Sequence, residues 1–309
     1  MERTADSNLE TALEQVRTTP KSGAPEVCTF FDTATNTASH VVWDRATGRA
    51  AIIDSVLDYD PASGQIATTS AELIVGLVQS EGLTVDWLLE THVHADHLTA
   101  AKHLQGILGG AICLSRAVTH VQSTFGQLFN AGADFPRDGS AFDRLFDDGD
   151  RFWIGGLNVT VLHVPGHTPA DIAYVVGNAV FAGDTIFMPD WGTARADFPG
   201  GDARTLYRSI RRLLAFPEDT ILYLCHDYKP SGRDDYRWQT TVGDERRANI
   251  HVHDGVDEDS FAEVRTARDA SLPVPRLIFP SLQVNMRAGR LPEPEANGRR
   301  YLKIPLTTS

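Results

Sequence analysis

A short run of metal-ligand side chains constrains this chain more than any other feature of its sequence. Residues 91–99 read THVHADHLT, and four ligand-type side chains stand within six positions: His92, His94, Asp96 and His97. The apolar run TVDWLLE comes directly before them and predicts a buried strand that leads into the turn. Imidazole and carboxylate groups crowded together in this way suit zinc or iron.

Three more segments repeat the same arrangement further along the chain. His167 lies in VPGHTPAD, Asp184 in FAGDTIF and His226 in LYLCHDY, and each residue follows a predicted strand. Side chains at strand ends project into a cleft while the sheets hold them rigid, as a metal site requires. The three cysteines form no C-x-x-C pair, so a thiolate zinc site is not expected.

The order of the predicted elements indicates a sandwich of two sheets. Three β runs within residues 26–55 precede a helix over 69–82, for which Ser70 is a candidate N-cap and Leu73 part of the apolar face. A second β block covers 151–184, and helices follow from Asp202 and from SFAE, a capping-box match at Ser260. Two β-rich halves, each followed by helices, predict an α+β fold in which helices cover two stacked sheets.

Composition and the terminal segments limit the class of protein. The net charge of −13 disfavours binding to nucleic acid or to anionic membranes. No apolar run of 18 residues occurs, and residues 1–25 lack the apolar core of a signal peptide, so we expect a cytoplasmic protein. Residues 1–25 are predicted to be a leader with a short helix through Leu9–Val16. Residues 26–309 are predicted to be one domain with a C-terminal helical and loop extension.

The ligand segments carry a family resemblance. THVHADH, GHT, AGD and HDY resemble the metallo-β-lactamase superfamily, whose fold is an αββα sandwich, and the resemblance covers roughly residues 26–290. Within that superfamily the chain is most similar to the persulfide dioxygenases, also called sulfur dioxygenases, through GTARADF, CHDY and VNMRAG. The stretches DYDPASG and GTARADFPGG are similar to the bacterial β-lactamase-like hydrolase branch of these enzymes.

Two metal chemistries remain open on the residues alone. The ligands of a two-zinc hydrolase of glyoxalase II or lactonase type are all present, as two sets of three and a bridging residue: His92, His94 and His167; Asp96, His97 and His226; Asp184. Such a pair of zinc ions would generate a hydroxide nucleophile. A third possibility is a non-enzymatic binding or regulatory protein of the same fold, whose signature would be eroded ligands; none is eroded here.

The resemblance favours one ferrous ion per chain, although zinc is possible in protein as purified. It implies that His92, His167 and Asp184 hold the iron, a two-histidine, one-carboxylate set that leaves open positions for substrate and O₂. The remaining four residues would then support the site: His94, Asp96, His97 and His226. The implied reaction, part of sulfide detoxification, converts glutathione persulfide, O₂ and water to glutathione and sulfite.

The same resemblance implies residues for the substrate and an oligomeric state. Arg195, supported by Asp197, is expected beside glutathione, because a guanidinium can bind a carboxylate through two bonds. Tyr228 is expected to reach the iron pocket, and Arg287 of VNMRAG is a second candidate anchor. A homo-oligomer, with a dimer favoured, is expected. His251, in a stretch over 229–255 that is longer than its counterpart in the family, is predicted to be an exposed loop residue.

Overall fold

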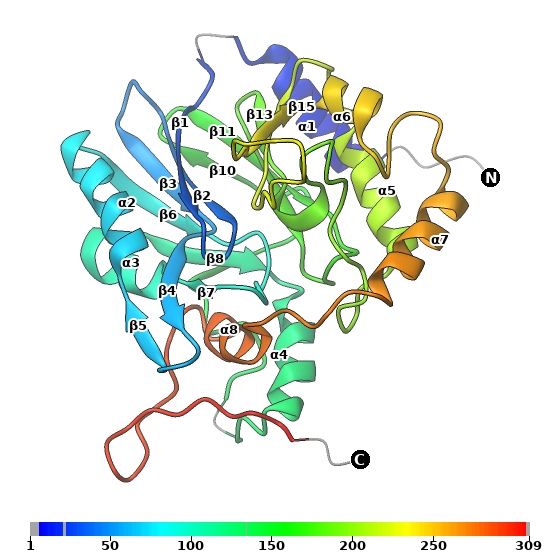
Figure 1. Cartoon of the computed structure of the whole chain (residues 1–309). Helices are drawn as coiled ribbons and strands as arrows, with labels where there is room; N and C mark the ends of the chain where they lie inside the picture. The colour runs from blue at the N-terminus through cyan, green and yellow to red at the C-terminus, as the bar shows by residue number, and fades with distance from the viewer. Residues whose placement is uncertain (1–5, 21–22, 134, 307–309) are drawn as a thin grey trace.

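The computed structural model describes residues 6–20, 23–133 and 135–306. Two six-stranded sheets stack face to face, and helices cover both outer faces (Figure 1). The first sheet has the order β1-β2-β3-β6-β8-β9 and the second the order β10-β11-β12-β13-β14-β15. This four-layer arrangement is the αββα sandwich that the sequence predicts, and it confirms the α+β fold.

The first sheet is antiparallel at one edge and parallel at the other. Its strands are β1 (Glu26–Asp32), β2 (Thr37–Trp43), β3 (Arg49–Ile53), β6 (Thr84–Leu89), β8 (Ala111–Ser115) and β9 (Arg144–Phe146). The parallel pairs β3–β6, β6–β8 and β8–β9 need crossover connections. Helices supply them on the outer face: α2 (Thr69–Ser80), α3 (Ala101–Leu108) and α4 (Val118–Leu128).

The second sheet is mostly an antiparallel meander. Its strands are β10 (Arg151–Ile154), β11 (Leu157–His163), β12 (Ile172–Val176), β13 (Ala179–Phe181), β14 (Ile221–Tyr223) and β15 (Gln239–Thr241). The hairpin at Gly177-Asn178 joins β12 to β13 as predicted, and β13 pairs with β14 in parallel. The remaining helices are α1 (Ser7–Thr18), α5 (Ala203–Leu213), α6 (Val242–Ala248), α7 (Glu258–Asp269) and α8 (Ile278–Asn285). A small sheet, β5-β4-β7, completes the fold: β4 (Val56–Asp60), β5 (Gln65–Ala67) and β7 (Leu98–Thr99).

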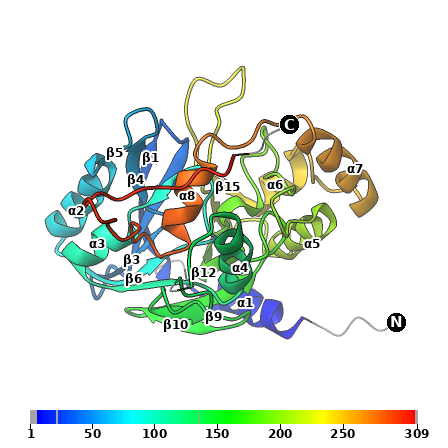
Figure 2. The same ribbon diagram turned by 90° about the horizontal axis from the view of Figure 1, so that it is seen from below.

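The core divides into three layers of buried apolar side chains. One layer lies between the two sheets and includes Phe146, Phe152 and Tyr174. A second layer packs the first sheet against α2, α3, α4 and α8, and a third packs the second sheet against α1 and α5. Figure 2 shows α8 beside α4, with the C-terminal segment running across it. No helix in the described part of the chain is long and apolar enough to cross a membrane.

Two predicted helix starts are wrong in detail. Ser70 is not the N-cap of α2, because the helix begins at Thr69 and the Ser70 amide and hydroxyl bind the Asp58 carboxylate at 2.9 and 2.8 Å. Leu73 is 58% exposed and does not belong to the buried face of α2. SFAE is no capping box, since α7 begins earlier and Asp257 accepts from the Ser260 amide at 2.8 Å.

The predicted N-terminal helix is present as α1, and it packs on the outer face of the second sheet (Figure 1). Gln15 is its buried polar contact. The Gln15 amide nitrogen lies 2.9–3.1 Å from the carbonyls of Asn158, Val175 and Gly177, and its oxygen accepts from the Thr160 hydroxyl at 2.7 Å. This one side chain therefore satisfies polar groups around the β12–β13 hairpin.

We expect Gln15→Ala to lower the free energy of unfolding by about 2–3 kcal/mol, because the buried carbonyls and the Thr160 hydroxyl lose their partner. Urea denaturation followed by circular dichroism measures the change. Glu14→Ala is the matched control, since Glu14 is exposed on the same helix. An equal effect of both substitutions would contradict the role given to Gln15.

Candidate metal centre

The predicted ligand residues meet at one edge of the sandwich. His92 follows β6 of the first sheet, whereas His167, Asp184 and His226 follow β11, β13 and β14 of the second. The structure brings these residues together with the rest of the histidine turn, in overlapping groups whose ligand atoms lie within 4.8 Å of one another. Both sheets therefore contribute to a single centre, and their packing fixes its geometry.

One group consists of His92, His167 and Asp184. The Nε2 atoms of the two histidines each lie 3.7 Å from Asp184 Oδ2. Two ligand atoms around one metal ion are about 3.0–3.6 Å apart for bonds of about 2.1 Å. The two observed separations lie just above this range, and all three side chains are buried. This group could therefore hold one metal ion after a small adjustment of the side chains.

A second group lies beside the first, next to Asp184. His226 Nε2 is 3.3 Å from Asp184 Oδ1 and 3.4 Å from Asp96 Oδ2. His94, Asp96, His97 and His226 form a group of potential ligands. The geometry thus accommodates a second metal ion, and the distances do not decide between one ion and two.

Unpaired atoms provide the test of whether a metal fits here. Five buried ligand-type atoms of the centre have no hydrogen-bond partner among the described residues: His92 Nε2, His94 Nδ1, His97 Nε2, His226 Nε2 and Asp184 Oδ1. Buried polar atoms are normally paired, because an unpaired one costs free energy. Several such atoms converging on one centre fit metal binding.

The opposite ring nitrogens are held by the protein. His167 Nδ1 is 2.7 Å from the Arg195 carbonyl, and His226 Nδ1 is 3.1 Å from the Asn36 carbonyl. A carbonyl only accepts, so each Nδ1 carries the proton and each Nε2 keeps its lone pair free for a metal. His92 Nδ1 lies 3.1 Å from the Thr91 hydroxyl. Burial and the charge of neighbouring histidines hold the pKa of His92 well below its usual value, so its ring stays neutral.

His94 differs from the other histidines of the turn. Its Nε2 is 2.9 Å from Asp54 Oδ1 and 3.3 Å from Glu90 Oε2. Burial opposes a charge on His94, but the two carboxylates outweigh burial and raise its pKa well above the usual value. Both carboxylates contact Nε2, and the opposite nitrogen of the ring, Nδ1, is buried and unpaired. A metal-binding histidine often donates its other ring N–H to a carboxylate, so these contacts fit a ligand role through Nδ1 as well as a supporting role for His94.

Asp54, Glu90 and Asn285 contact the histidine turn but are not among the site residues expected from the sequence. The Asn285 amide group donates to the carbonyls of His94 and His97 at 2.9 and 2.8 Å, and its oxygen accepts from the Thr99 amide at 2.9 Å. Asn285 thus clamps the whole histidine turn from the end of α8. The segment VNMRAG gave a signal, but the asparagine in it, rather than the arginine, contacts the centre.

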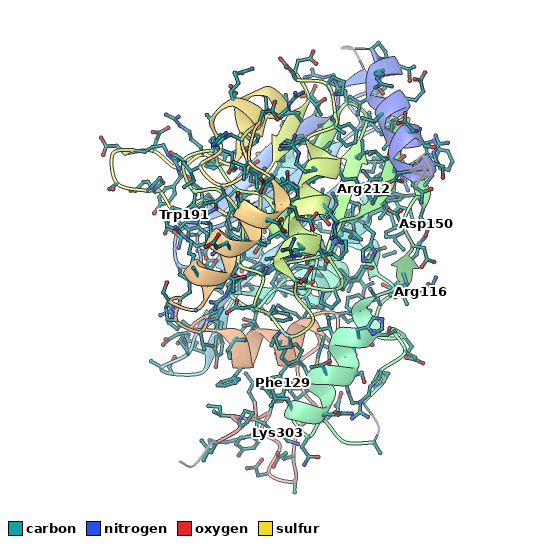
Figure 3. All side chains as sticks on the ribbon, turned by 90° about the vertical axis from the view of Figure 1, so that its right-hand side faces the viewer. Arg116, Phe129, Asp150, Trp191, Arg212 and Lys303 are labelled. Atoms are coloured by element: carbon teal, nitrogen blue, oxygen red, sulfur yellow. The ribbon has the colours of Figure 1, made fainter. Side chains whose placement is uncertain are left out.

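A cavity of about 570 Å³ opens over the centre. Asp96, His167 and Asp184 lie among its lining residues, beside Phe187 and Trp191. Trp191 is labelled in Figure 3 beside α7, and the Arg268 guanidinium of that helix lies 5.7 Å from its ring. The remaining wall includes Tyr228 and several arginines, so the cavity combines aromatic faces with positive charge.

The structure places the residues that were expected to bind substrate in different surroundings. Arg195 lines the cavity, but Asp197 binds its guanidinium through two bonds of 2.5 and 2.7 Å. Tyr228 also lines the cavity; burial and the nearby carboxylates of Asp184 and Asp96 raise its pKa well above the usual value, so the phenol keeps its proton.

The structure does not place Arg287 in this cavity. Its guanidinium packs 4.5 Å from the Phe135 ring, donates to the Gln283 carbonyl and lines a different cavity. Arg287 is therefore not placed to anchor a substrate in the cavity over the metal centre, although the sequence predicted this role. Its side chain points to another side of the molecule than that of Asn285.

His251 is not the exposed loop residue that the sequence indicates. It is half-buried, and its Nδ1 accepts from the Thr193 amide at 3.2 Å. Burial, with the charges of Arg265 and Arg268, lowers the pKa of His251 to about 4, so the ring is neutral and can accept this bond. Residues of the 229–255 stretch therefore support the loop that lies next to the metal centre.

Comparisons with known proteins agree with this geometry. The model of the metallo-beta-lactamase superfamily matches residues 32–226. A probable metallo-hydrolase of Burkholderia pseudomallei is 58% identical over 90% of this chain and 97% of its own length. Glyoxylase B2 of Dictyostelium discoideum is 44% identical, covering 92% and 98%. The mitochondrial persulfide dioxygenase ETHE1 of Homo sapiens is 28% identical, covering 92% and 97%. Other relatives are longer, and the chain spans 65% of their length.

Solved structures give the same picture. ETHE1 from Myxococcus xanthus has a TM-score of 0.68 and 29% identity, and the match covers 86% of this chain and all of that chain. A protein solved in a di-iron-bound form has a TM-score of 0.53 and 26% identity, covering 72% and 99%. These likenesses do not establish which metal this chain binds or how many ions it holds.

We expect Asn285→Ala to weaken metal binding roughly 10- to 100-fold, because the turn that carries His92 loses its clamp. Metal affinity by competition with a coloured chelator measures the effect. Gln283→Ala is the control: Gln283 lies on the same helix and binds the Phe279 and Lys303 carbonyls, away from the turn. Unchanged affinity in folded Asn285→Ala would show that the clamp is dispensable.

Proposed function

The chain belongs to the metallo-β-lactamase superfamily, and we propose that within it the protein is an iron-dependent persulfide dioxygenase. The proposed reaction converts glutathione persulfide, O₂ and water to glutathione, sulfite and two protons. The observation that carries the proposal is the group of His92, His167 and Asp184 at the base of a cavity with positively charged walls. The likeness to persulfide dioxygenase ETHE1 along nearly the whole chain supports it.

The proposed ligand set suits ferrous iron. Two imidazoles and one carboxylate are the usual ligands of non-haem iron oxygenases, and they leave positions for two reactants. A ferrous ion bound there would supply the redox chemistry that O₂ activation requires. The chain would supply the orientation: the Arg195 carbonyl fixes the His167 ring, and Asp54 and Glu90 fix the His94 ring through its Nε2 atom.

Tyr228 is the proposed hydrogen-bond donor to the substrate. Its phenol has no hydrogen-bond partner among the described residues and keeps its proton at neutral pH, because burial and the carboxylates of Asp184 and Asp96 raise its pKa. Its ring lies 5.7 Å from those of His226 and Phe187, which hold it against the centre. The hydroxyl can therefore donate to a persulfide or to an oxygen atom of a product.

Arg268 and Arg276 are the proposed anchors for the glutathione carboxylates. Both line the cavity, and neither has a carboxylate within ion-pair distance in the part of the chain described. Arg195, by contrast, is already neutralised by Asp197, so a substrate carboxylate would have to displace that residue. Two unpaired guanidinium groups match the two carboxylates of glutathione, and guanidinium binds carboxylate well.

The second candidate function is that of a two-metal hydrolase acting on thioesters or lactones. The observation in its favour is that the Nε2 atoms of His97 and His226 are buried and unpaired, and that His226 Nε2 lies 3.4 Å from Asp96 and 3.3 Å from Asp184. The likenesses to a probable metallo-hydrolase and to glyoxylase B2 also favour it. Its nucleophile would be a hydroxide generated between two zinc ions.

Reconstitution with each metal separates these functions. We expect protein loaded anaerobically with Fe²⁺ to consume one O₂ for each glutathione persulfide and to release sulfite. Protein loaded with Zn²⁺ should not hydrolyse a glutathione thioester. Thioester hydrolysis without O₂ uptake would establish the hydrolase instead. Folded, metal-loaded protein with neither activity would support a binding role.

Removal of one anchor should change KM rather than iron content. We expect Arg268→Gln and Arg276→Gln each to raise the KM for glutathione persulfide roughly 5- to 30-fold, the effect of about 1–2 kcal/mol from one partly exposed charged contact. Steady-state O₂ consumption, with iron measured on the same samples, checks this. Arg287→Gln should leave KM unchanged, because Arg287 faces another cavity. A rise in that variant alone would restore the original expectation for Arg287.

A further inference from the structure

The loop over residues 192–198 connects the metal centre to the C-terminal helices. Its Arg195 carbonyl accepts from His167 Nδ1 at 2.7 Å and so sets the direction of the opposite nitrogen of that ring. A shift of this carbonyl would turn His167 Nε2 away from Asp184. The placement of one peptide group therefore governs one ligand of the centre.

Two side chains of α7 hold this loop on either side of Arg195. Arg265 Nη1 donates to the Thr193 carbonyl at 3.1 Å, and Asp269 Oδ2 accepts from the Ala196 amide at 2.8 Å. The two side chains also bind each other, with Arg265 Nη2 2.6 Å from Asp269 Oδ1. Only 2% of Arg265 and 5% of Asp269 is exposed. The pair thus spans the peptide that orients His167.

We propose that Arg265 and Asp269 are positioning residues for the metal centre: this buried ion pair fixes the Arg195 carbonyl and thereby the metal-binding direction of His167. Both residues lie beyond residues 32–226, which the superfamily model matches, so the family match does not assign them. His167 lies within residues 32–226, whereas the orientation of its ring depends on contacts from α7.

The position of the pair favours this role over simple docking of the helix. Phe261 of α7 is buried in the apolar layer with α5, and Glu258 pairs with Arg208 of α5 at the surface. These contacts attach α7 without the pair. A buried ion pair adds little stability relative to apolar side chains, because both charges lose their hydration. Asp269 Oδ2 accepts from the Ala196 amide and Asp269 Oδ1 accepts from Arg265, so both oxygens help to fix the position of the loop.

The start of the loop is also held from the 229–255 stretch. The Asn249 amide group donates to the Gly192 carbonyl at 3.0 Å, and His251 accepts from the Thr193 amide. These contacts hold the start of the loop, whereas Asp269 and Arg265 bind backbone groups on both sides of Arg195. Loss of the pair should therefore leave the loop attached but misplace the Arg195 carbonyl.

The test is Asp269→Asn, which keeps the side-chain volume and removes the charge. Zn²⁺ affinity is measured by competition with a chelator. The zinc ion of interest is the one that is no longer bound in the His167→Ala variant. We expect this affinity to fall 10- to 100-fold, while the melting temperature of the metal-free protein stays near that of Glu258→Gln. Glu258→Gln is the matched control, since it removes an ion pair of the same helix and should leave the affinity unchanged.

A conservative variant keeps the test decisive if Asp269→Asn does not fold. Arg265→Lys retains the charge but cannot bind Thr193 and Asp269 together, so we expect a smaller loss of affinity, about 3- to 10-fold. The visible spectrum of the Co²⁺-loaded variant should shift, because the His167 ligand is tilted. Wild-type affinity and spectrum in a folded variant would overturn the proposal. The outcome does not depend on the oxidation reaction proposed above.

Discussion

The burial of unpaired nitrogen and oxygen atoms at the edge of the sandwich is the constraint on which the site depends. Such atoms cost free energy unless a metal or another partner satisfies them. The fold meets this demand by placing ligands at the ends of strands from both sheets, where the apolar layers on either side hold the backbone. The outer hydrogen bonds then decide which ring nitrogen faces the centre, and Arg195, Asn36 and Asp54 supply them.

Those outer contacts also explain how the C-terminal third takes part in the site. Asn285 of α8 clamps the histidine turn, and Arg265 and Asp269 of α7 hold the loop beside His167. Each contact joins residues far apart in the sequence, and each binds backbone rather than the ligand side chain. The metal centre is therefore built from the superfamily core but aligned by segments outside it.

The cluster of candidate ligands could be predicted from the sequence, because each residue follows an apolar strand and ligand-type residues at strand ends leave a local pattern. The arrangement of two sheets covered by helices could be predicted from the same strand and helix patterns. The supporting residues left no such pattern: Asn285 and His94 are separated by 191 positions, and only the folded chain brings them together. Arg287 was misassigned because the resemblance of the VNMRAG segment does not tell which way each of its side chains points. Ser70 was misassigned because Asp58, twelve residues away, competes for its amide.

The central claim is that one metal ion, held by His92, His167 and Asp184, performs the chemistry, with His94 turned toward carboxylates as a support. Anomalous diffraction at the iron edge from crystals reconstituted with Fe²⁺ tests it most directly. The account predicts one peak per chain, within bonding distance of His92 Nε2, His167 Nε2 and Asp184 Oδ2. A second peak of comparable height among Asp96, His97 and His226 would contradict it.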